Sequence, residues 1–167
     1  MPIKKIVRIA LLSAILYVAK FILECLPNVE LVSFLTILYT LVFGTEAFFV
    51  VTVFNLFEFI QWGFGTWFIS YLYVWPILVL LTLLFKKLFK EEFLLWAILS
   101  GLFGLIFGSM FAVVYIFIDP HYALTYFISG LPWDVWHCIA NFIIMILIGR
   151  PTYKILCKLS RVDIPNS

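Results

Sequence analysis

The sequence predicts an all-α polytopic membrane protein, a single bundle of six transmembrane helices over residues 1–167 with both termini in the cytoplasm. The composition is the first reason: 65% of the residues are hydrophobic and 12% are charged. A soluble domain of this length has too much surface facing water to bury so many apolar side chains. The second reason is that the basic residues gather at the ends of apolar runs. We therefore expect lipid to surround most of the chain.

The basic residues predict the orientation of the spans. Ten of the eleven Lys and Arg residues form three clusters, within 4–8, 86–90 and 150–161. Basic residues that flank a span are retained on the cytoplasmic side, so all three clusters are expected inside. The exception is Lys20, which lies within the first apolar run and can either pair with a neighbouring acid or extend toward the interface.

Four spans follow from apolar length. A helix needs about 20 apolar residues to cross a hydrocarbon core of about 30 Å. The runs at 6–26, 67–85 and 93–118 meet this requirement, and a shorter run at 134–149 is polar at its outer end. The first run has no cleavage site of the A-x-A type, so we interpret it as a retained span and not as a signal peptide.

The number of spans between Asn28 and Lys86 follows from the side of the membrane on which each of these residues is expected. The first part of this stretch, 31–62, is too long for one span and short for two. The chain is outside at Asn28 and must be inside at Lys86, which requires an odd number of crossings. Two short spans at 31–43 and 46–62, together with 67–85, satisfy this requirement.

The connections between these spans also follow. Three loops are expected outside, at 27–30, 63–66 and 119–133. The third is the longest, and we expect it to lie along the interface and to be partly helical, because bare loop backbone cannot face lipid. Asp163 is expected inside with the basic tail.

Polar and aromatic residues recur on single faces of three expected spans. Residues three, four or seven positions apart share a helical face, as Asn55, Glu58 and Trp62 do. A carboxyl group near the bilayer centre costs about 2.5–3.5 kcal/mol on the insertion scale, so it usually faces a wet cavity. We expect a pocket with flat aromatic walls and polar anchors near the outer face. The candidate substrate-binding residues are Glu58, Trp62, Trp67, Tyr71, Trp75, Trp133, Asp134, His137 and Asn141.

Simpler interpretations of these residues stay open. Trp and Tyr also gather at membrane interfaces as anchors. Asp134 can cap the sixth helix, and His137 and Asn141 can form hydrogen bonds between helices. Glu58 is the hardest of the set to explain without a function.

Small residues predict close helix contacts. Ala10 and Ala14 form an A-x-x-x-A step on the first span, and the fifth span carries a second small face. Such faces let helices approach closely in lipid. Internal packing is an open interpretation of both faces.

Several chemistries have no recognisable motif here. The sequence contains no Walker A motif, no H-E-x-x-H and no G-x-S-x-G. The three cysteines form no C-x-x-C pair, which argues against a zinc site. We expect no catalytic residues, no metal and no cofactor bound by this chain, so active transport would need ATP hydrolysis by a partner.

The order and spacing of several segments resemble one transporter family. They are the A-x-x-x-A step near a basic N-terminus, the stretches 27–44 and 63–76, and GLPWDVWHCIAN at 130–141 leading to GRP at 149–151. Together they resemble the substrate-binding S components of energy-coupling factor (ECF) vitamin transporters. The similarity runs over most of the chain.

The resemblance implies a protein of a bacterial-type plasma membrane that captures a vitamin or precursor from outside. It implies that Ala10 and Ala14 dock on a transmembrane coupling subunit, which two ATPase subunits drive. Within the family the chain looks most like members assigned to hydroxymethylpyrimidine or pyridoxine. An anionic ligand fits less well, because Lys20 is the only Lys or Arg near the outer rim.

Two other functions stay open at this point. One is an intramembrane enzyme that uses Glu58, Asp134 and His137 as acid, base or metal ligands. Two histidines without a clear third ligand make a poor catalytic metal site. The other is a non-transporting assembly subunit whose polar residues only hold helices together.

Overall fold

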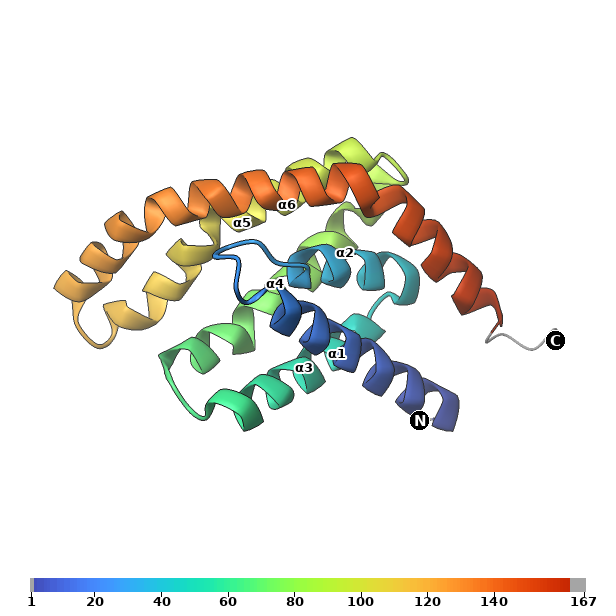
Figure 1. Ribbon diagram of the computed structural model, residues 1–167, viewed down its shortest axis with the longest axis horizontal. Coiled ribbons are helices and arrows are strands. Elements are labelled where there is room, and N and C mark those ends of the chain that lie inside the picture. The colour runs from blue at the N-terminus through green and yellow to red at the C-terminus, as the bar shows by residue number, and fades with distance from the viewer. Residues whose placement is uncertain (1, 163–167) are drawn as a thin grey trace.

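The computed structural model describes residues 2–162, and the secondary structure in that range consists of helices joined by short connections, with no strand (Figure 1). Asp163 therefore lies outside the described residues. The prediction of an all-α fold is confirmed. The six helices are α1 (Ile3–Leu23), α2 (Val32–Phe43), α3 (Glu46–Trp62), α4 (Thr66–Phe89), α5 (Phe93–Ile116) and α6 (Pro120–Val162).

Four of these helices are long and apolar enough to cross a membrane: α1, α4, α5 and α6 up to Ser160. Helix α2 is apolar but has only 12 residues, and α3 has 17. Both fall short of the roughly 20 residues that a span needs. Several helices can thus span a bilayer, and the six-span topology stays a prediction.

Helix α6 differs most from the sequence expectation. It begins at Pro120, not near residue 134, and continues for 43 residues through the segment that we expected to be a partly helical loop. The reason is a strong start signal: Asp119 Oδ1 accepts the backbone N–H groups of His121 and Tyr122 at 2.9 and 3.2 Å, and Pro at the first helical position has no N–H to satisfy. At 1.5 Å per residue α6 is roughly 65 Å long, about twice the hydrocarbon thickness.

Helices α1 and α3 run parallel and in register. The Arg8 guanidinium donates to Glu46 at 2.7 Å, and the Lys20 ammonium donates to Glu58 at 2.5 Å. Both pairs join residues 38 apart in the sequence. Between them the Ser13 hydroxyl donates to the backbone of α3 at 2.9 Å. Three bonds at a nearly constant offset fix the two helices along their common length.

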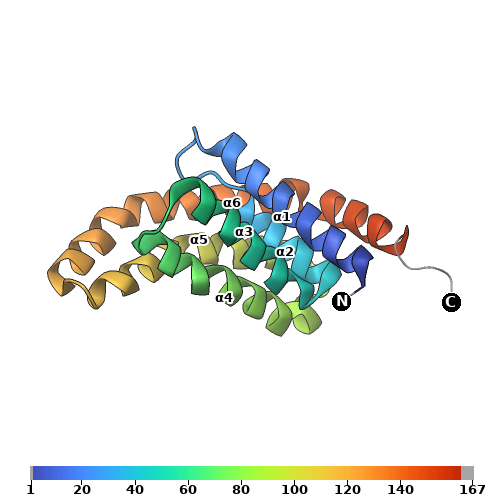
Figure 2. The same ribbon diagram turned by 90° about the horizontal axis from the view of Figure 1, so that it is seen from below.

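Helices α5 and α6 form an antiparallel hairpin that projects beyond the other helices (Figures 1 and 2). Glycines on α5 allow the close approach. A Cβ at Gly101 would lie 3.2 Å from the carbonyl oxygen of Cys138, and one at Gly104 would lie 2.9 Å from that of His137. The small face of the fifth helix therefore packs internally against α6.

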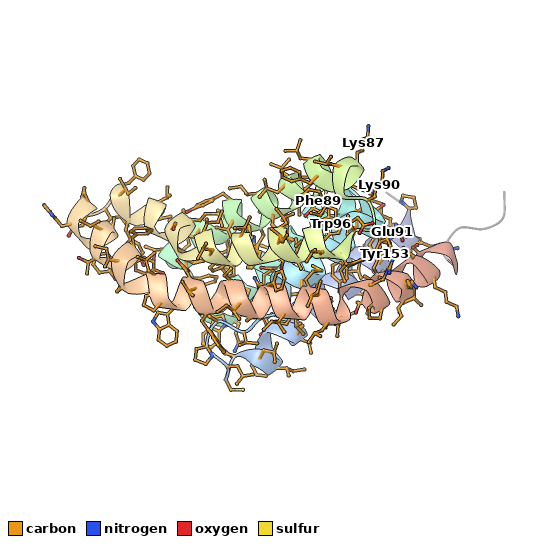
Figure 3. The ribbon with its side chains drawn as sticks, turned by 90° about the horizontal axis from the view of Figure 1, so that it is seen from above. Lys87, Phe89, Lys90, Glu91, Trp96 and Tyr153 are labelled. Carbon is orange, nitrogen blue, oxygen red and sulfur yellow. The ribbon has the colours of Figure 1, made fainter. Side chains whose placement is uncertain are left out.

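The two ends of the bundle differ in charge. At the end where α4 meets α5, which we call the basic end, Lys87 and Lys90 extend away from the helices (Figure 3). The Trp96 indole below them donates to the carbonyl of Lys90 at 2.9 Å and packs edge-on against Phe89. The opposite end, where α1 and α3 terminate, carries Glu24, Glu30 and Glu58 and is called the acidic end.

The outward surface is apolar. Large hydrophobic side chains such as Ile60, Leu84 and Leu147 are each about 70% exposed or more. Helix α2, by contrast, is buried along almost its whole length. An apolar exterior of this extent is unusual for a water-soluble protein and suits a lipid environment.

Candidate functional site

Three adjoining cavities open at the acidic end. The first, of about 370 Å³, is lined by Lys20, Glu24, Glu58, Trp62, Trp67, Tyr71 and Phe111. The second, of about 190 Å³, lies under the loop between α1 and α2 and reaches Tyr71, Trp75, Phe107 and His137. The third, of about 380 Å³, lies between α5 and α6 and is lined by Asn28, Phe107, Gly108, Phe111, Tyr126, Ser129, Gly130, Trp133 and Asp134. We call them the first, second and third cavity. Each shares lining residues with the other two.

The first cavity contains an ion pair. Glu58 on α3 is only 2% exposed, and its Oε2 lies 2.5 Å from the Lys20 Nζ on α1. The sequence left the partner of Lys20 open, and the structure assigns Glu58. Burying an unpaired carboxylate is costly, which explains why the one basic residue in the C-terminal half of α1 lies opposite it.

Aromatic side chains from α4 form the wall between the first two cavities. Trp67, Tyr71 and Trp75 follow one another edge-to-face, with ring centroids 5.4 Å apart at each step. Trp75 is buried, and its indole N–H has no hydrogen-bond partner in residues 2–162. Trp62 lies at the rim and is 52% exposed. The predicted aromatic stripe of α4 therefore borders the cavities.

A second polar pair links the α1–α2 loop to α6. The His137 Nε2 lies 3.2 Å from Glu30 Oε1, and Glu30 also accepts the backbone N–H of Ser33 at 2.9 Å. The burial of Glu30 acts to raise its pKa, but His137 and Ser33 outweigh it and hold the pKa of this carboxyl below its ordinary value of 4.5. Nearby, the Asn28 amide donates to the carbonyl of Trp133 at 2.9 Å.

Two of the predicted site residues on α6, Asp134 and Asn141, have different surroundings. Asp134 is 4% exposed and lines the third cavity, where its Oδ1 accepts the backbone N–H of Gly108 at 2.9 Å. Asn141 is fully buried, with its amide 3.5 Å from the carbonyl of Ser100, and it lines none of the three cavities. The contact of Asn141 is one between helices, the simpler interpretation left open for it.

Several residues that line the cavities were not among the candidates predicted from the sequence. They include Glu24, Asn28, Glu30, Phe107 and Phe111. Glu30 carried a usable signal, since an acid just before an apolar run accepts N–H groups at a helix start. Phe107 and Phe111 looked like ordinary apolar residues of a span, and only the packing of α5 against α4 and α6 turns them inward.

The predicted docking residues lie away from these cavities. Ala10 is exposed and Ala14 is half-buried, whereas Ile9, Leu12 and Leu16 face the interior. The rest of the chain therefore leaves much of this alanine face uncovered. Ala14 also borders an apolar surface groove of about 440 Å³ along α1.

Within residues 2–162, no group of three or more His, Cys, Asp and Glu side chains is arranged to hold a metal ion. Comparison of the chain with protein-family models, with curated proteins and with solved structures gives no match. The functional interpretation therefore depends on the geometry of the cavities and on the resemblance of the sequence segments described above.

Proposed function

We propose that this chain is the substrate-binding S component of an ECF-type transporter of a plasma membrane. It captures a small aromatic vitamin or vitamin precursor from outside, with pyridoxine or hydroxymethylpyrimidine favoured, for ATP-driven uptake through partner subunits. The observation that carries the proposal is the convergence of Glu58, Tyr71, Trp75, Asp134 and His137, from α3, α4 and α6, around adjoining cavities.

The chemistry of the cavities supports a planar ligand with hydroxyl or cationic groups. Aromatic walls favour a flat ring, and carboxyl groups accept hydrogen bonds from hydroxyl and N–H groups. Among the described residues, Lys20 is the only Lys or Arg that lines the three cavities, and Glu58 already neutralises it. An anionic ligand would therefore find no free basic partner there.

The exposed alanine face supports the transport part of the proposal. Small residues on an uncovered helix face permit close contact with another membrane helix. Ala10 and Ala14 would contact the coupling subunit, and two ATPase subunits would supply the energy. The absence of a nucleotide-binding motif in the sequence agrees with this division of labour.

The enzyme alternative is less well supported by the geometry. Acid–base catalysis needs its groups within hydrogen-bond reach of one reacting atom. Glu58 lines the first cavity, His137 the second and Asp134 the third. Glu58 is in addition held by Lys20, and His137 by Glu30.

Native mass spectrometry of the detergent-purified protein tests the proposal, followed by calorimetric titration with pyridoxine, hydroxymethylpyrimidine and a panel of other vitamins. We expect a one-to-one complex with a single compound. No binding across the panel would contradict the proposal and favour the enzyme or assembly alternatives.

Two variants then test the site. Glu58→Gln and His137→Ala should each weaken binding about tenfold or more, since each removes a hydrogen bond involving a charged group. Asn141→Ala is the matched control, because Asn141 lies one turn along α6 from His137 and lines none of the three cavities. Unchanged affinity in both site variants, or an equal loss in the control, would contradict the assignment of the cavities.

A further inference from the structure

Among the described residues, Asp134 is the one buried acid of the acidic end that forms no salt bridge, although His137 interacts with it electrostatically. Glu58 pairs with Lys20, and Glu30 pairs with His137. In residues 2–162 Asp134 forms no salt bridge, and its Oδ2 has no hydrogen-bond partner although the residue is 96% buried. Leaving such an oxygen unsatisfied costs free energy. The third cavity, which Asp134 lines, is where a partner can approach.

The backbone of α5 holds this carboxyl group in place. Gly108 donates its N–H to Oδ1 at 2.9 Å, and a Cβ at this position would lie 2.6 Å from Oδ2 and 2.7 Å from Oδ1. Any larger residue at Gly108 would displace the carboxyl group. Gly130 lines the same cavity, but a Cβ there would meet nothing within 4 Å. The need for glycine at position 108 is thus specific to the contact with Asp134.

The remaining walls are aromatic. Phe107 and Phe111 come from α5, and Tyr126 and Trp133 come from α6. The ring faces of aromatic side chains attract cations, most strongly in a site removed from water. The volume of about 380 Å³ exceeds the roughly 150 Å³ of a cavity that holds benzene. A ring with a charged substituent therefore fits.

We propose that the third cavity binds the cationic end of a small aromatic ligand, with an N–H group of that cation donating to Asp134 Oδ2 and the surrounding rings stabilising its charge. The ligand class is an organic ammonium or a protonated ring nitrogen. The inference rests on the proposed function, since it takes the cavities to be the ligand site. It goes further by assigning the charge of the ligand and the residue that recognises it.

The test uses two probes of similar shape, benzylammonium and benzyl alcohol, titrated calorimetrically into the full-length purified protein at neutral pH. Wild type should bind the cation about tenfold more tightly than the alcohol or better. Asp134→Asn keeps the shape of the side chain and an oxygen that accepts the Gly108 N–H. It should remove the preference for benzylammonium over benzyl alcohol. Equal affinities in wild type, no binding of either probe, or a preference that survives Asp134→Asn would each overturn the inference.

Two neighbouring variants of α5 give a second, independent measurement. Gly108→Ala should weaken benzylammonium binding, and Ser109→Ala, at the next position of α5 and outside the lining of the three cavities, should leave it unchanged, with folding checked by helical circular dichroism. Equal effects of the two variants would overturn the inference. If benzylammonium binds through Asp134 but no vitamin binds, only the proposed function fails. If a vitamin binds with the same affinity in wild type and Asp134→Asn, only this inference fails.

Discussion

The Lys20 ammonium lies 2.5 Å from the Glu58 carboxylate, and this bond joins α1 to α3 at the acidic end of the bundle. Arg8 and Lys5 repeat the contact near the other end, where both pair with Glu46. Helix α1 thus carries an inward face fixed to α3 and an outward face with the exposed Ala10. Lys20 and the alanine face belong to the same helix, so α1 connects the first cavity to an exposed apolar surface.

Removing only one member of the Lys20–Glu58 pair should destabilise the protein more than removing both charges. Lys20→Met leaves Glu58 buried without a partner, and a loss of about 3 kcal/mol in stability is expected, the lower end of the range for buried pairs because Lys20 borders an open cavity. Lys20→Met combined with Glu58→Gln should recover part of this loss. Thermal unfolding in detergent measures the three midpoints. A double variant less stable than Lys20→Met would contradict the buried-charge argument.

The α5–α6 contact should not tolerate a methyl group at Gly104. The added Cβ would lie 2.9 Å from the His137 carbonyl, which is backbone and cannot move aside cheaply. Overpacking of this kind costs about 1–3 kcal/mol. Gly130→Ala is the control, since its Cβ meets no atom and alanine favours a helix by up to about 1 kcal/mol. Equal melting temperatures for Gly104→Ala and Gly130→Ala would show that the hairpin packs less closely than described.

Substitutions on the outward face of α1 should reduce uptake of the ligand but not its binding affinity. Ala10→Trp and Ala14→Trp add bulk to a face that the rest of the chain leaves largely uncovered, so ligand affinity is expected to stay at the wild-type level. Uptake by cells that carry the partner subunits should be abolished, because a close helix contact needs small residues. Leu84→Trp, on an exposed position of α4, is the control and should leave uptake unchanged. Normal uptake in both alanine variants would remove the docking role of this face.

The sequence predicted the helical class well, because apolar length and basic flanks act through local composition. It missed the extent of the helix at residues 119–133, where a partly helical outer loop was predicted and α6 is continuous. Asp119 caps this helix and Pro120 occupies its first position, and this start signal needs no apolar run directly behind it. Local capping, not hydropathy, determined the start of α6.

The sequence placed candidate residues on shared helical faces but did not predict the contacts between helices. Helical spacing placed Glu58 and Trp62, and separately Asp134, His137 and Asn141, on shared faces. Spacing along one helix cannot indicate which helix lies opposite. The pairing of His137 with Glu30 joins residues 107 apart, and that of Lys20 with Glu58 joins residues 38 apart. Both depend on tertiary packing, which also turns Asn141 away from the cavities.

The bond between Glu30 and His137 should make stability depend on pH in the acid range. The pKa of Glu30 is lower in the folded protein than its ordinary value of 4.5, so the unfolded chain binds a proton more readily than the folded one. The stabilisation is therefore fully present above about pH 4.5 and is lost as the pH falls through the folded pKa. Wild type should unfold at a higher temperature than Glu30→Gln at about pH 7, and the difference should shrink as the pH falls below about 4.5. Glu91→Gln, at an exposed position of the basic end, controls for the removal of a charge. A difference between wild type and Glu30→Gln that stays constant across this range would mean that the carboxylate form of Glu30 does not hold the α1–α2 loop against α6.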